Sequence, residues 1–385
     1  AAALVVGVVV FRRLHALGLQ ARRATTPGAA LSRRRVLIGT SAAVGVGAVL
    51  PIGLGTWLTR DVTGSREEVT RALAGARLAE RAPAIPPTAA FAESGTPFVT
   101  ANADFYRIDT ALRVPVLAAD EWSLRLHGMV DRELTLTFDD LLARPLVERT
   151  ITLLCVSNEV GGPYISTTNF IGVDLREILL EAGIRPGADQ VLSTSSDGWT
   201  AGTPVDVLLE ADRGALLAVG MNGEALPPEH GFPVRMVVPG LYGYVSATKW
   251  VTDLEVTTFG ARQAYWLQRG WGEKAPIKTQ SRIDVPGGRV PAGRVTVAGT
   301  AWSQPIGISA VEVRLDGGAW QQAELATEVN HDTWRMWRTA FDVAPGEHTV
   351  QVRATDRNGV TQTEQRRDVV PDGATGWHTV TFAAA

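Results

Sequence analysis

Cysteine is almost absent from this 385-residue sequence, which contains only Cys155. A single cysteine excludes an intrachain disulfide and every zinc or iron–sulfur site that needs several cysteines. The chain also contains no Walker-type phosphate loop, no HExxH zinc motif and no GxSxG nucleophile motif. The common nucleotide-binding, zinc-protease and serine-hydrolase classes therefore have no support in the sequence.

Acidic residues are absent from the first 60 positions, although the whole chain is nearly balanced, with 37 lysines and arginines against 40 acids. The net charge of −3 argues against a dedicated nucleic-acid-binding protein. The acid-free stretch holds arginines at positions 12, 13, 22, 23, 33, 34, 35 and 60. The sequence therefore combines a basic, apolar start with a body that carries both signs of charge and can bury a core.

Charged side chains are also missing from Val36 to Leu58. As a helix, this run would rise ~35 Å, enough to cross a hydrocarbon core of ~30 Å. It is longer than the ~7–15 apolar residues of a signal-peptide core, so we predict a retained transmembrane helix over 36–58. A buried hydrophobic helix is the alternative. Arg33, Arg34 and Arg35 stand directly before the run, and the positive-inside rule assigns them to the cytoplasm. We therefore expect a plasma-membrane protein whose body lies outside the cytoplasm.

A second uncharged run covers residues 1–11 and is followed by a basic loop over 12–35. We interpret residues 1–11 as a truncated membrane span, with a buried helix as the alternative. The string SRRRVLI, residues 32–38, resembles a twin-arginine export signal, which serves proteins that fold around a cofactor before export. Arginines beside a membrane helix are also ordinary topology determinants, so both interpretations stay open.

The body begins with a predicted tether over 61–99, which contains a short amphipathic helix over 66–81 and then several prolines. Residues 100–273 mix helix and strand signals and predict an α+β domain. Thr137 is placed to cap a helix over 138–142, and Gly183 to end a helix over 175–182. Asn222-Gly223 is typical of a hairpin turn.

Residues 274–385 carry short strand signals at hairpin spacing and no helix signals. The turn sequences Asp316-Gly317-Gly318 and Asn358-Gly359 separate the strands. About seven strands in ~110 residues predict an immunoglobulin-like β-sandwich. Domains of this kind usually make contacts rather than chemistry.

Three segments of the first domain carry side chains suited to chemistry. Cys155 ends an apolar, β-branched strand above a glycine-rich loop, where a thiol can meet a ligand, although a lone cysteine is often just a small buried hydrophobe. His230 and Arg235 belong to the run HGFPVR, and Lys249 to YGYVSATKW. An imidazole, a guanidinium and an ammonium from adjacent strand ends form a good cradle for a phosphate. Each of them alone could equally be an ordinary surface or loop charge.

The runs LLCVSNEVGGPYISTTNFIGVDLREIL and LPPEHGFPVRMVVPGLYGYVSATKW, followed by a β-sandwich, resemble the sulfite-oxidase superfamily of molybdopterin enzymes. The resemblance covers residues 96–385 and includes the order of the two domains. It implies a molybdenum–molybdopterin cofactor whose metal binds a cysteine thiolate, the position that Cys155 holds. A soft thiolate ligand suits such a metal.

The resemblance also implies further cofactor contacts. The segment NADFY, residues 102–106, resembles the family's N-x-x-F-Y segment, which touches the cofactor. Ser195 matches a small hydroxyl contact at the end of a strand. The cofactor-binding residues implied are Asn102, Phe105, Tyr106, Cys155, Ser195, His230, Arg235, Ser246, Thr248 and Lys249, with Lys249 the best defined of the last three.

The sequence departs from animal and plant sulfite oxidases just after the cysteine. Those enzymes present arginines there, whereas this chain has Asn158, Glu159 and Val160. Arg107 is a candidate catalytic residue that would partly replace them. We therefore expect a pocket that handles a neutral or weakly charged molecule better than a dianion.

The sequence as a whole predicts a membrane-anchored molybdopterin oxidoreductase that moves an oxygen atom to or from a small, sulfur-containing substrate. This chain shows no haem module, so electrons would pass to or from a separate carrier, such as a membrane quinone, a cytochrome or another protein. The resemblance implies a dimerisation-type C-terminal domain, which leaves a homodimer open. Two alternatives remain: a cofactor-free adhesion module, and a hydrolase with Cys155 as nucleophile and His230 as base.

Overall fold

The computed structural model describes residues 62–385. The predicted membrane segments, basic loop and export signal over 1–60 lie outside the described residues. Over 62–385, none of the helices has both the length and the apolar character needed to span a membrane. By its internal contacts, the described part of the chain forms one compact unit.

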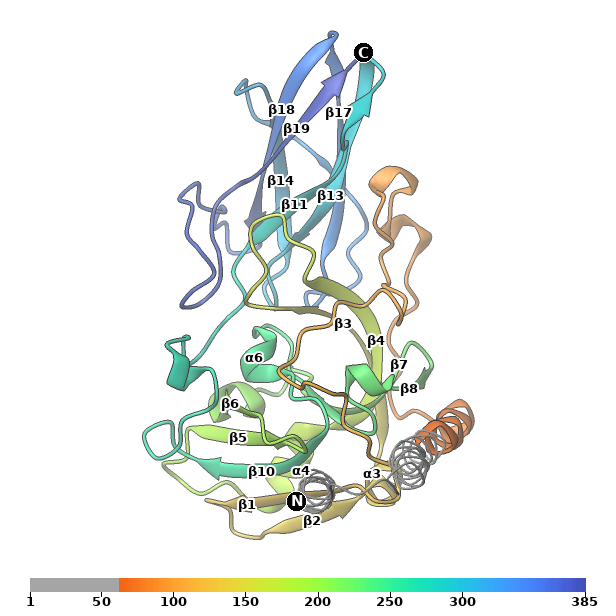
Figure 1. Cartoon of the computed structure of the whole chain (residues 1–385), viewed down its shortest axis with the longest axis vertical. Helices are drawn as coiled ribbons and strands as arrows, with labels where there is room; N and C mark the ends of the chain where they lie inside the picture. The colour runs from red at the N-terminus through yellow and green to blue at the C-terminus, as the bar shows by residue number, and fades with distance from the viewer. Residues whose placement is uncertain (1–61) are drawn as a thin grey trace, which may run out of the picture. The chain divides into compact units, whose positions relative to one another are not determined.

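Strands dominate the first domain, and the helices that the sequence predicts are short. One sheet has the strand order β2–β1–β10–β5–β6, and a second has β3–β4–β7–β8, with β9 paired to β7 (Figure 1). The strands are β1 (Ser123–Gly128), β2 (Leu134–Thr137), β3 (Leu146–Leu154), β4 (Ile165–Asp174), β5 (Gln190–Ser195), β6 (Thr200–Pro204), β7 (Leu216–Met221), β8 (Glu224–Ala225), β9 (Arg235–Val237) and β10 (Val251–Thr257). The helices are α3 (Phe138–Leu142), α4 (Leu175–Ala182), α5 (Val205–Leu209) and α6 (Gly243–Ser246). The predicted α+β domain is thus mainly β, with short helices between its strands.

Local signals place several element ends where the sequence predicts them. Thr137 caps α3: its side chain accepts from the Asp140 backbone N–H, and the Asp140 carboxylate accepts from the Thr137 N–H. Gly183 ends α4 with φ +71°. Asn222 and Gly223, with φ of +51° and +81°, turn β7 into β8.

The central strand pair carries Cys155 to its position. Strands β3 and β4 pair in antiparallel register from Leu146↔Val173 to Leu154↔Ile165, and β3 is mostly buried. Directly beyond the pair, the Cys155 N–H donates to the Tyr164 carbonyl at 3.0 Å. This hydrogen bond holds together the two ends of the loop between β3 and β4. It therefore fixes the backbone position of Cys155, the first residue of the loop.

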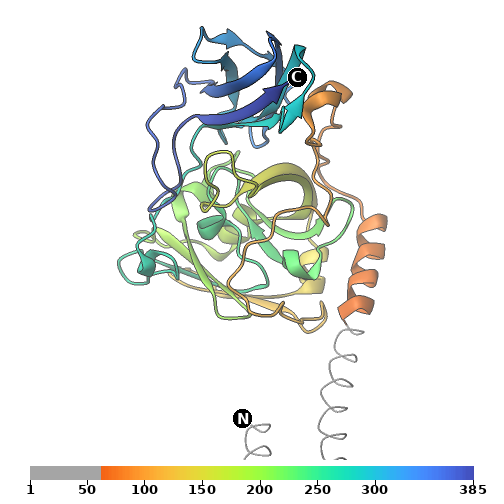
Figure 2. The same ribbon diagram turned by 45° about the horizontal axis from the view of Figure 1, so that its top comes forward.

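The second domain consists of two sheets that pack around their own core. Figure 2 shows this domain in cyan and blue at the top of the view. The sheet orders are β11–β13–β17–β16 and β12–β19–β18–β14–β15. Val297, Val311, Trp337 and Val352 are fully buried in this core. The strands are β11 (Gln280–Val285), β12 (Arg289–Val290), β13 (Gly293–Trp302), β14 (Ile308–Leu315), β15 (Gln321–Gln322), β16 (Glu324–Leu325), β17 (Arg335–Val343), β18 (Gly346–Asp356) and β19 (His378–Ala384). A helix-free two-sheet sandwich over this part of the chain agrees with the strand pattern in the sequence.

The segment predicted as a tether packs against the body. Residues 62–75 are helical, four residues earlier than the start of the predicted helix over 66–81. Val69 and Leu73 of this helix are buried, and Arg66 donates to the Leu226 carbonyl at 3.0 Å. Farther along, the Phe98 carbonyl accepts from the Trp334 indole at 3.0 Å. Residues 62–99 therefore contact both domains.

Candidate active site

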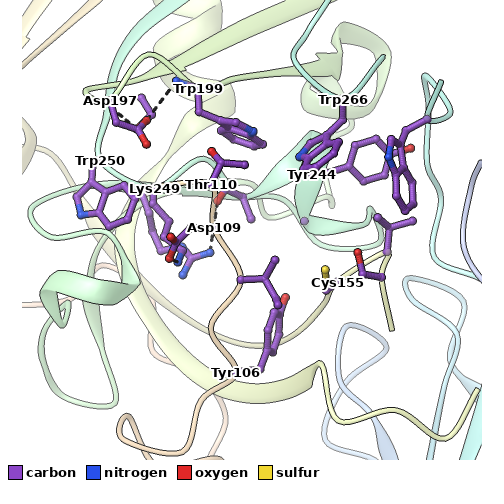
Figure 3. Close-up of a pocket in the computed structure, with 18 of the residues that line it drawn as sticks. Tyr106, Asp109, Thr110, Cys155, Asp197, Trp199, Tyr244, Lys249, Trp250 and Trp266 are labelled. Carbon is purple, nitrogen blue, oxygen red and sulfur yellow. Dashed lines mark hydrogen bonds and ion pairs between the residues drawn. The ribbon is translucent and has the colours of Figure 1, made fainter. Parts of the chain in front are cut away.

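A pocket opens above Cys155 in the first domain, with a volume of about 880 Å³ that includes its open mouth. Figure 3 shows Lys249 and Asp109 on the left, Trp266 and Tyr244 on the right, and Cys155 and Tyr106 below them. It is lined by Phe105, Tyr106, Ile108, Asp109, Thr110, Cys155, Val156, Ser157, Ser195, Asp197, Trp199, Arg235, Gly243, Tyr244, Ala247, Lys249, Trp250, Trp266 and Trp271. Six of the predicted site residues therefore meet here, namely Phe105, Tyr106, Cys155, Ser195, Arg235 and Lys249.

Cys155 is a free thiol with 9% of its surface exposed. Burial raises its pKa, while hydrogen bonding from Ser157 and the charge of Lys249 act in the opposite direction. Among residues 62–385 no group of three or more His, Cys, Asp and Glu side chains is arranged to hold a metal ion. Within this part of the chain, a metal at Cys155 would need further ligands from a cofactor.

Arg235 is a buried cation with 3% exposure. Its guanidinium donates to the His230 carbonyl at 3.1 Å and lies 5.6 Å from the centre of the Phe170 ring. Burial lowers its pKa to about 10. Within the described chain, no carboxylate pairs with Arg235, and its Nε has no hydrogen-bond partner. A buried guanidinium without an acid is costly, so this position favours an anionic ligand.

Lys249 is the second cation of the pocket. Its Nζ donates to Asp109 Oδ2 and to the Glu229 carbonyl, both at 3.0 Å. Burial and the nearby charge of Arg235 lower its pKa to about 8. Gly231 allows the two cations to approach, because a Cβ at Gly231 would lie 3.1 Å from the Cβ of both Arg235 and Lys249. The two cations of the predicted phosphate cradle therefore both lie close to Gly231 of the HGFPVR run.

His230 lies behind the pocket lining rather than in it. Its Nε2 is 3.1 Å from the Asn102 carbonyl, and its ring meets the Phe105 ring edge-on at 5.3 Å. Burial and the charges of Arg235 and Lys249 lower its pKa to about 4. Its Nδ1 is buried and has no hydrogen-bond partner among the described residues.

The segment 102–106 reaches the site through its two aromatic residues. Phe105 and Tyr106 stack at 5.3 Å, and the Tyr106 N–H donates to Ser166 Oγ at 3.2 Å. Burial raises the pKa of the Tyr106 phenol, which therefore stays protonated. Asn102 lies away from the pocket, and its amide donates to Glu224 at 2.6 Å. Asn102 thus contacts the site only through the backbone carbonyl that faces His230.

The predicted hydroxyl contacts separate into two groups. Ser195, at the end of β5, lines the pocket. Ser246 is buried and donates to the Leu241 and Tyr242 carbonyls, each at 3.0 Å. Thr248 is buried and bonds Ser193 Oγ at 2.6 Å. The structure places these two side chains outside the pocket lining, where they brace the loop that presents Lys249.

Arg107, the predicted catalytic arginine, does not line the pocket. Its side chain is 45% exposed, and its Nε donates to Asp109 at 2.9 Å. Burial raises the pKa of Asp109, but the hydrogen bonds from Arg107 and Lys249 outweigh that effect, so the pKa is lowered overall. Arg107 therefore faces the pocket only through Asp109.

An aromatic wall is the main feature that sequence reasoning missed. Trp199, Trp250, Trp266, Trp271 and Tyr244 line the pocket. Tyr244 and Trp271 lie 5.8 Å apart, and Trp266 and Trp271 lie 6.0 Å apart, measured between ring centres. The available signal was the high tryptophan count of 11, together with the close pair in the run WLQRGW, residues 266–271.

Glu159 and Val160 do not form the pocket wall that the sequence suggested. Glu159 is exposed, Val160 is buried, and neither lines the pocket. Asn158 is buried and accepts from the Tyr164 N–H at 2.7 Å. The chain turns away directly after Ser157, so nearness to Cys155 in sequence does not bring these side chains into the site.

These residues fit a molybdenum–pterin cofactor. Cys155 offers a soft thiol ligand at the pocket. Arg235 and Lys249 offer cations, and the unpartnered Arg235 Nε can serve an anionic group. The set suits a cofactor that is thiophilic at one end and carries a phosphate at the other.

Comparisons with known proteins agree with this class. The sequence model of the oxidoreductase molybdopterin-binding domain family matches residues 111–266. Sulfite oxidase from Gallus gallus is 30% identical over 321 residues, which cover 70% of this chain and 69% of that protein. Mitochondrial sulfite oxidase from Homo sapiens is 30% identical over 305 residues, 66% of this chain and 55% of that protein. The chain thus spans about half the length of the mammalian relatives that it matches.

A bacterial relative and a solved structure extend the comparison. The uncharacterized oxidoreductase YuiH of Bacillus subtilis is 34% identical over 151 residues, 39% of this chain and 72% of that protein. The crystal structure of the sulfane dehydrogenase SoxCD from Paracoccus pantotrophus aligns with a TM-score of 0.65, at 23% identity, over 78% of this chain and 88% of that one. The latter likeness shows the fold.

Fold and site together define a molybdenum-cofactor oxidoreductase. Within that class, the chain belongs to the sulfite-oxidase family of molybdopterin enzymes. The predicted family, enzyme class and cofactor are confirmed. This membership favours the oxidoreductase over the adhesion module and the Cys155–His230 hydrolase.

Proposed function

We propose that the protein transfers an oxygen atom to or from a small, sulfur-containing substrate in the pocket above Cys155, and exchanges electrons with a separate redox carrier. The observation that carries this proposal is a free, buried thiol in a pocket that also holds an unpaired, buried arginine. The cofactor, when bound, supplies the two-electron oxygen-atom chemistry. The protein positions the substrate and limits the access of water.

Several residues of the pocket have distinct roles in this proposal. Cys155 would hold the metal, and Arg235 with Lys249 the phosphate end of the cofactor. Tyr106 is protonated and can donate a hydrogen bond within the pocket. The indoles of Trp199 and Trp266 form apolar surface against which a substrate can lose its water shell.

The walls of the pocket favour a neutral or weakly charged substrate over a dianion. Of the two cations that line the pocket, Lys249 is already paired with Asp109 at 3.0 Å, and Arg235 would serve the cofactor. Asp197 adds a second carboxylate, and most of the remaining wall is aromatic. A dianion would lose its hydration there without a free cation in exchange, which is unfavourable. An organic sulfoxide, or the corresponding thioether in the opposite direction, fits this pocket better than sulfite does.

Steady-state kinetics with sulfite as electron donor and with methionine sulfoxide as acceptor tests this proposal. We expect efficient turnover of the sulfoxide and weak oxidation of sulfite. Efficient sulfite turnover at a micromolar KM would contradict the argument from pocket charge. Absence of turnover with both, in protein fully loaded with molybdenum, would overturn the proposed substrate class.

We also propose a plasma-membrane protein with its catalytic body outside the cytoplasm, exported through the twin-arginine signal of Arg33-Arg34. The support is the acid-free, arginine-rich sequence before Asp61 and the uncharged run 36–58. The carrier would then be a membrane quinone, a cytochrome or another extracytoplasmic protein. The two-sheet second domain supports an immunoglobulin-like, dimerisation-type module, and size-exclusion chromatography with light scattering would test for the homodimer.

A further inference from the structure

One edge of the strand that leads to Cys155 pairs with no other strand of its sheet in the described part of the chain, and the second domain covers this edge. Strand β3 is the outermost strand of its sheet. Residues 79–80 bond its beginning, where the Glu148 N–H donates to the Glu80 carbonyl at 2.9 Å. Near its end, the backbone groups of Thr150 and Thr152 point away from β4 and need other partners.

Those partners come from two segments of the second domain. The Thr152 N–H donates to the Asp332 carbonyl at 2.9 Å, and the Thr152 carbonyl accepts from the Gln304 amide at 2.9 Å. The Thr150 carbonyl accepts from the Asn330 amide at 3.0 Å. The Trp334 N–H donates to Thr152 Oγ1 at 2.8 Å. Residues 330–334 therefore continue the hydrogen bonding of β3 close to Cys155.

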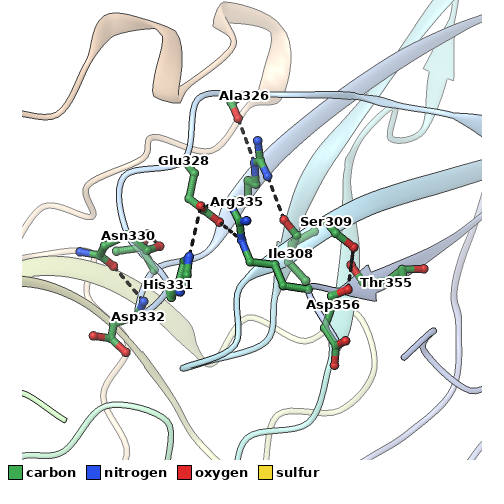
Figure 4. A network of polar contacts seen from close by, with 12 residues as sticks. Ile308, Ser309, Ala326, Glu328, Asn330, His331, Asp332, Arg335, Thr355 and Asp356 are labelled. Atoms are coloured by element: carbon green, nitrogen blue, oxygen red, sulfur yellow. Dashed lines mark hydrogen bonds and ion pairs between the residues drawn. The ribbon is translucent and has the colours of Figure 1, made fainter. Parts of the chain in front are cut away.

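The segment that makes these bonds is itself held firmly. Figure 4 shows the polar network around it. Arg335 donates to the Ala326 carbonyl at 3.0 Å and to the Ile308 carbonyl at 2.8 Å. Asn330 accepts from the Asp332 N–H at 2.9 Å. The segment thus meets β3 in a fixed shape.

The loop after Cys155 also rests on the second domain. Arg282 of β11 donates to the Gly162 carbonyl at 3.1 Å, and it is paired with Asp284 at 2.5 Å. Both side chains are about nine-tenths buried, with 11% and 10% exposed. Gly161, at φ +82°, lies against the His378 ring so closely that a Cβ would stand 2.2 Å from Nε2. The His378 ring is fixed in turn, because its Nδ1 accepts from the Ile283 N–H at 2.9 Å.

We propose that the second domain positions Cys155: residues 330–334 with Gln304 complete the edge of β3, and Arg282 with His378 fix the loop that follows. The thiol stands between these two contacts along the chain. The sandwich residues never reach the pocket, so they act as positioning residues. The inference rests on the proposed role of Cys155 as metal ligand, but the placement of the thiol can be measured without metal.

The test uses the only cysteine of the chain as its own reporter. The 385-residue chain, prepared without cofactor, is treated with a thiol-reactive disulfide reagent, and only Cys155 of this chain can respond. The variant Arg282→Gln with Asp284→Asn removes the bond to Gly162 without leaving a buried charge behind. We expect it to react at least about tenfold faster, as the loss of a buried, charge-assisted hydrogen bond predicts.

Two comparisons separate positioning from general destabilisation. Arg282→Lys keeps a donor for the Gly162 carbonyl and should restore a rate near that of the wild type. Arg294→Gln, whose side chain is 71% exposed in the same domain, should leave the rate unchanged. The thiol reaction rate of the double variant should change little with urea concentration at low urea, because a local opening exposes little surface. Global unfolding would instead give a steep dependence on urea concentration.

If the double variant does not unfold cooperatively, Asn330→Ala takes its place, because it removes the donor to the Thr150 carbonyl together with the acceptor of the Asp332 N–H. Wild-type rates in the folded variants would overturn the inference, as would a rate that follows global unfolding. Molybdenum analysis keeps the two proposals apart. A wild-type protein that binds no molybdenum, with variants that show the expected thiol rates, would overturn the proposed function and leave the positioning role intact.

Discussion

Lys249 Nζ lies 3.0 Å from Asp109 Oδ2, and each of the two side chains is 11% exposed. The pair stands on the wall of the pocket, and Arg107 contacts it from outside through the same carboxylate oxygen. The positive charge of Lys249 is thereby offset before a substrate enters. If Arg235 serves the cofactor as proposed, this pair leaves no free cation among the described residues of the pocket lining for a dianionic substrate.

Burial of Lys249 predicts a rise in stability at alkaline pH. The folded-state pKa of about 8 is below the ordinary value of 10.5, so the unfolded chain binds this proton more tightly. Lys249 should therefore contribute an increase of about 3 kcal/mol to the free energy of unfolding of the cofactor-free protein between these two pH values, while the raised pKa of Cys155 acts in the opposite direction. Urea denaturation should show that Lys249→Met removes this increase, while Lys274→Met, at an exposed position, retains it. A Lys249→Met protein with the wild-type pH dependence would contradict the assignment.

Loss of Arg235 should empty the site of cofactor. Removal of one partner from a buried ionic contact costs about 3–5 kcal/mol, which corresponds to a more than hundredfold weaker grip. The pterin and molybdenum content of purified Arg235→Ala should fall accordingly. Arg213→Ala serves as control, because Arg213 is 9% exposed and paired with Glu210 away from the pocket. Normal occupancy in Arg235→Ala would show that the anionic end of the cofactor lies elsewhere.

Acid should destabilise the protein through the buried His230 and the partly buried His378. Burial lowers the pKa of both His230 and His378 from 6.5 to about 4. The unfolded chain takes up these protons first, so the free energy of unfolding decreases as the pH falls from 6.5 to 4. Asp332 acts in the opposite sense, because burial raises its pKa to about 6.

A substitution isolates the contribution of His378 to this acid sensitivity. His378→Asn keeps an acceptor for the Ile283 N–H and should reduce the decrease by about 1–2 kcal/mol. His331→Asn, at an exposed position, is the matched control. Equal acid sensitivity in both variants would contradict a neutral, partly buried His378.

Topology can be read from a reporter fused after Ala385. A reporter that works only in the cytoplasm should be silent there, and strong activity would overturn the proposed orientation. Arg33-Arg34→Lys-Lys should slow export of the folded enzyme, whereas the matched change Arg22-Arg23→Lys-Lys should not. Equal export of both variants would leave Arg33 and Arg34 as topology determinants only.

Local chemistry explains what the sequence could predict. The ends of α3 and α4 and the turn at Asn222-Gly223 depend on neighbouring residues, so they are visible in a short window. Arg235 and Lys249 are recognisable for the same reason, because each belongs to a compact motif. Gly231 then brings the two motifs together in the structure.

Long-range packing explains what the sequence could not predict. The wall formed by Trp199 and Trp266 joins parts of the chain that share no motif, and the hydrogen bonds between Thr152 and Asp332 cross from one domain to the other. Nearness to Cys155 in the sequence was misleading for Glu159, because the loop turns away after Ser157 and leaves that carboxylate exposed. Arg107, predicted as a catalytic residue, does not line the pocket and contacts it through Asp109.

The most direct test of the account is X-ray absorption at the molybdenum edge, on the wild-type enzyme and on Cys155→Ser. Serine is nearly isosteric with cysteine, and the cofactor contacts at Arg235 and Lys249 are unchanged, so the variant should keep its fold and its molybdenum. The account predicts that the metal in Cys155→Ser has lost one sulfur neighbour, with activity reduced by orders of magnitude. An unchanged sulfur count, together with full activity, would contradict the assignment of Cys155 as the metal ligand.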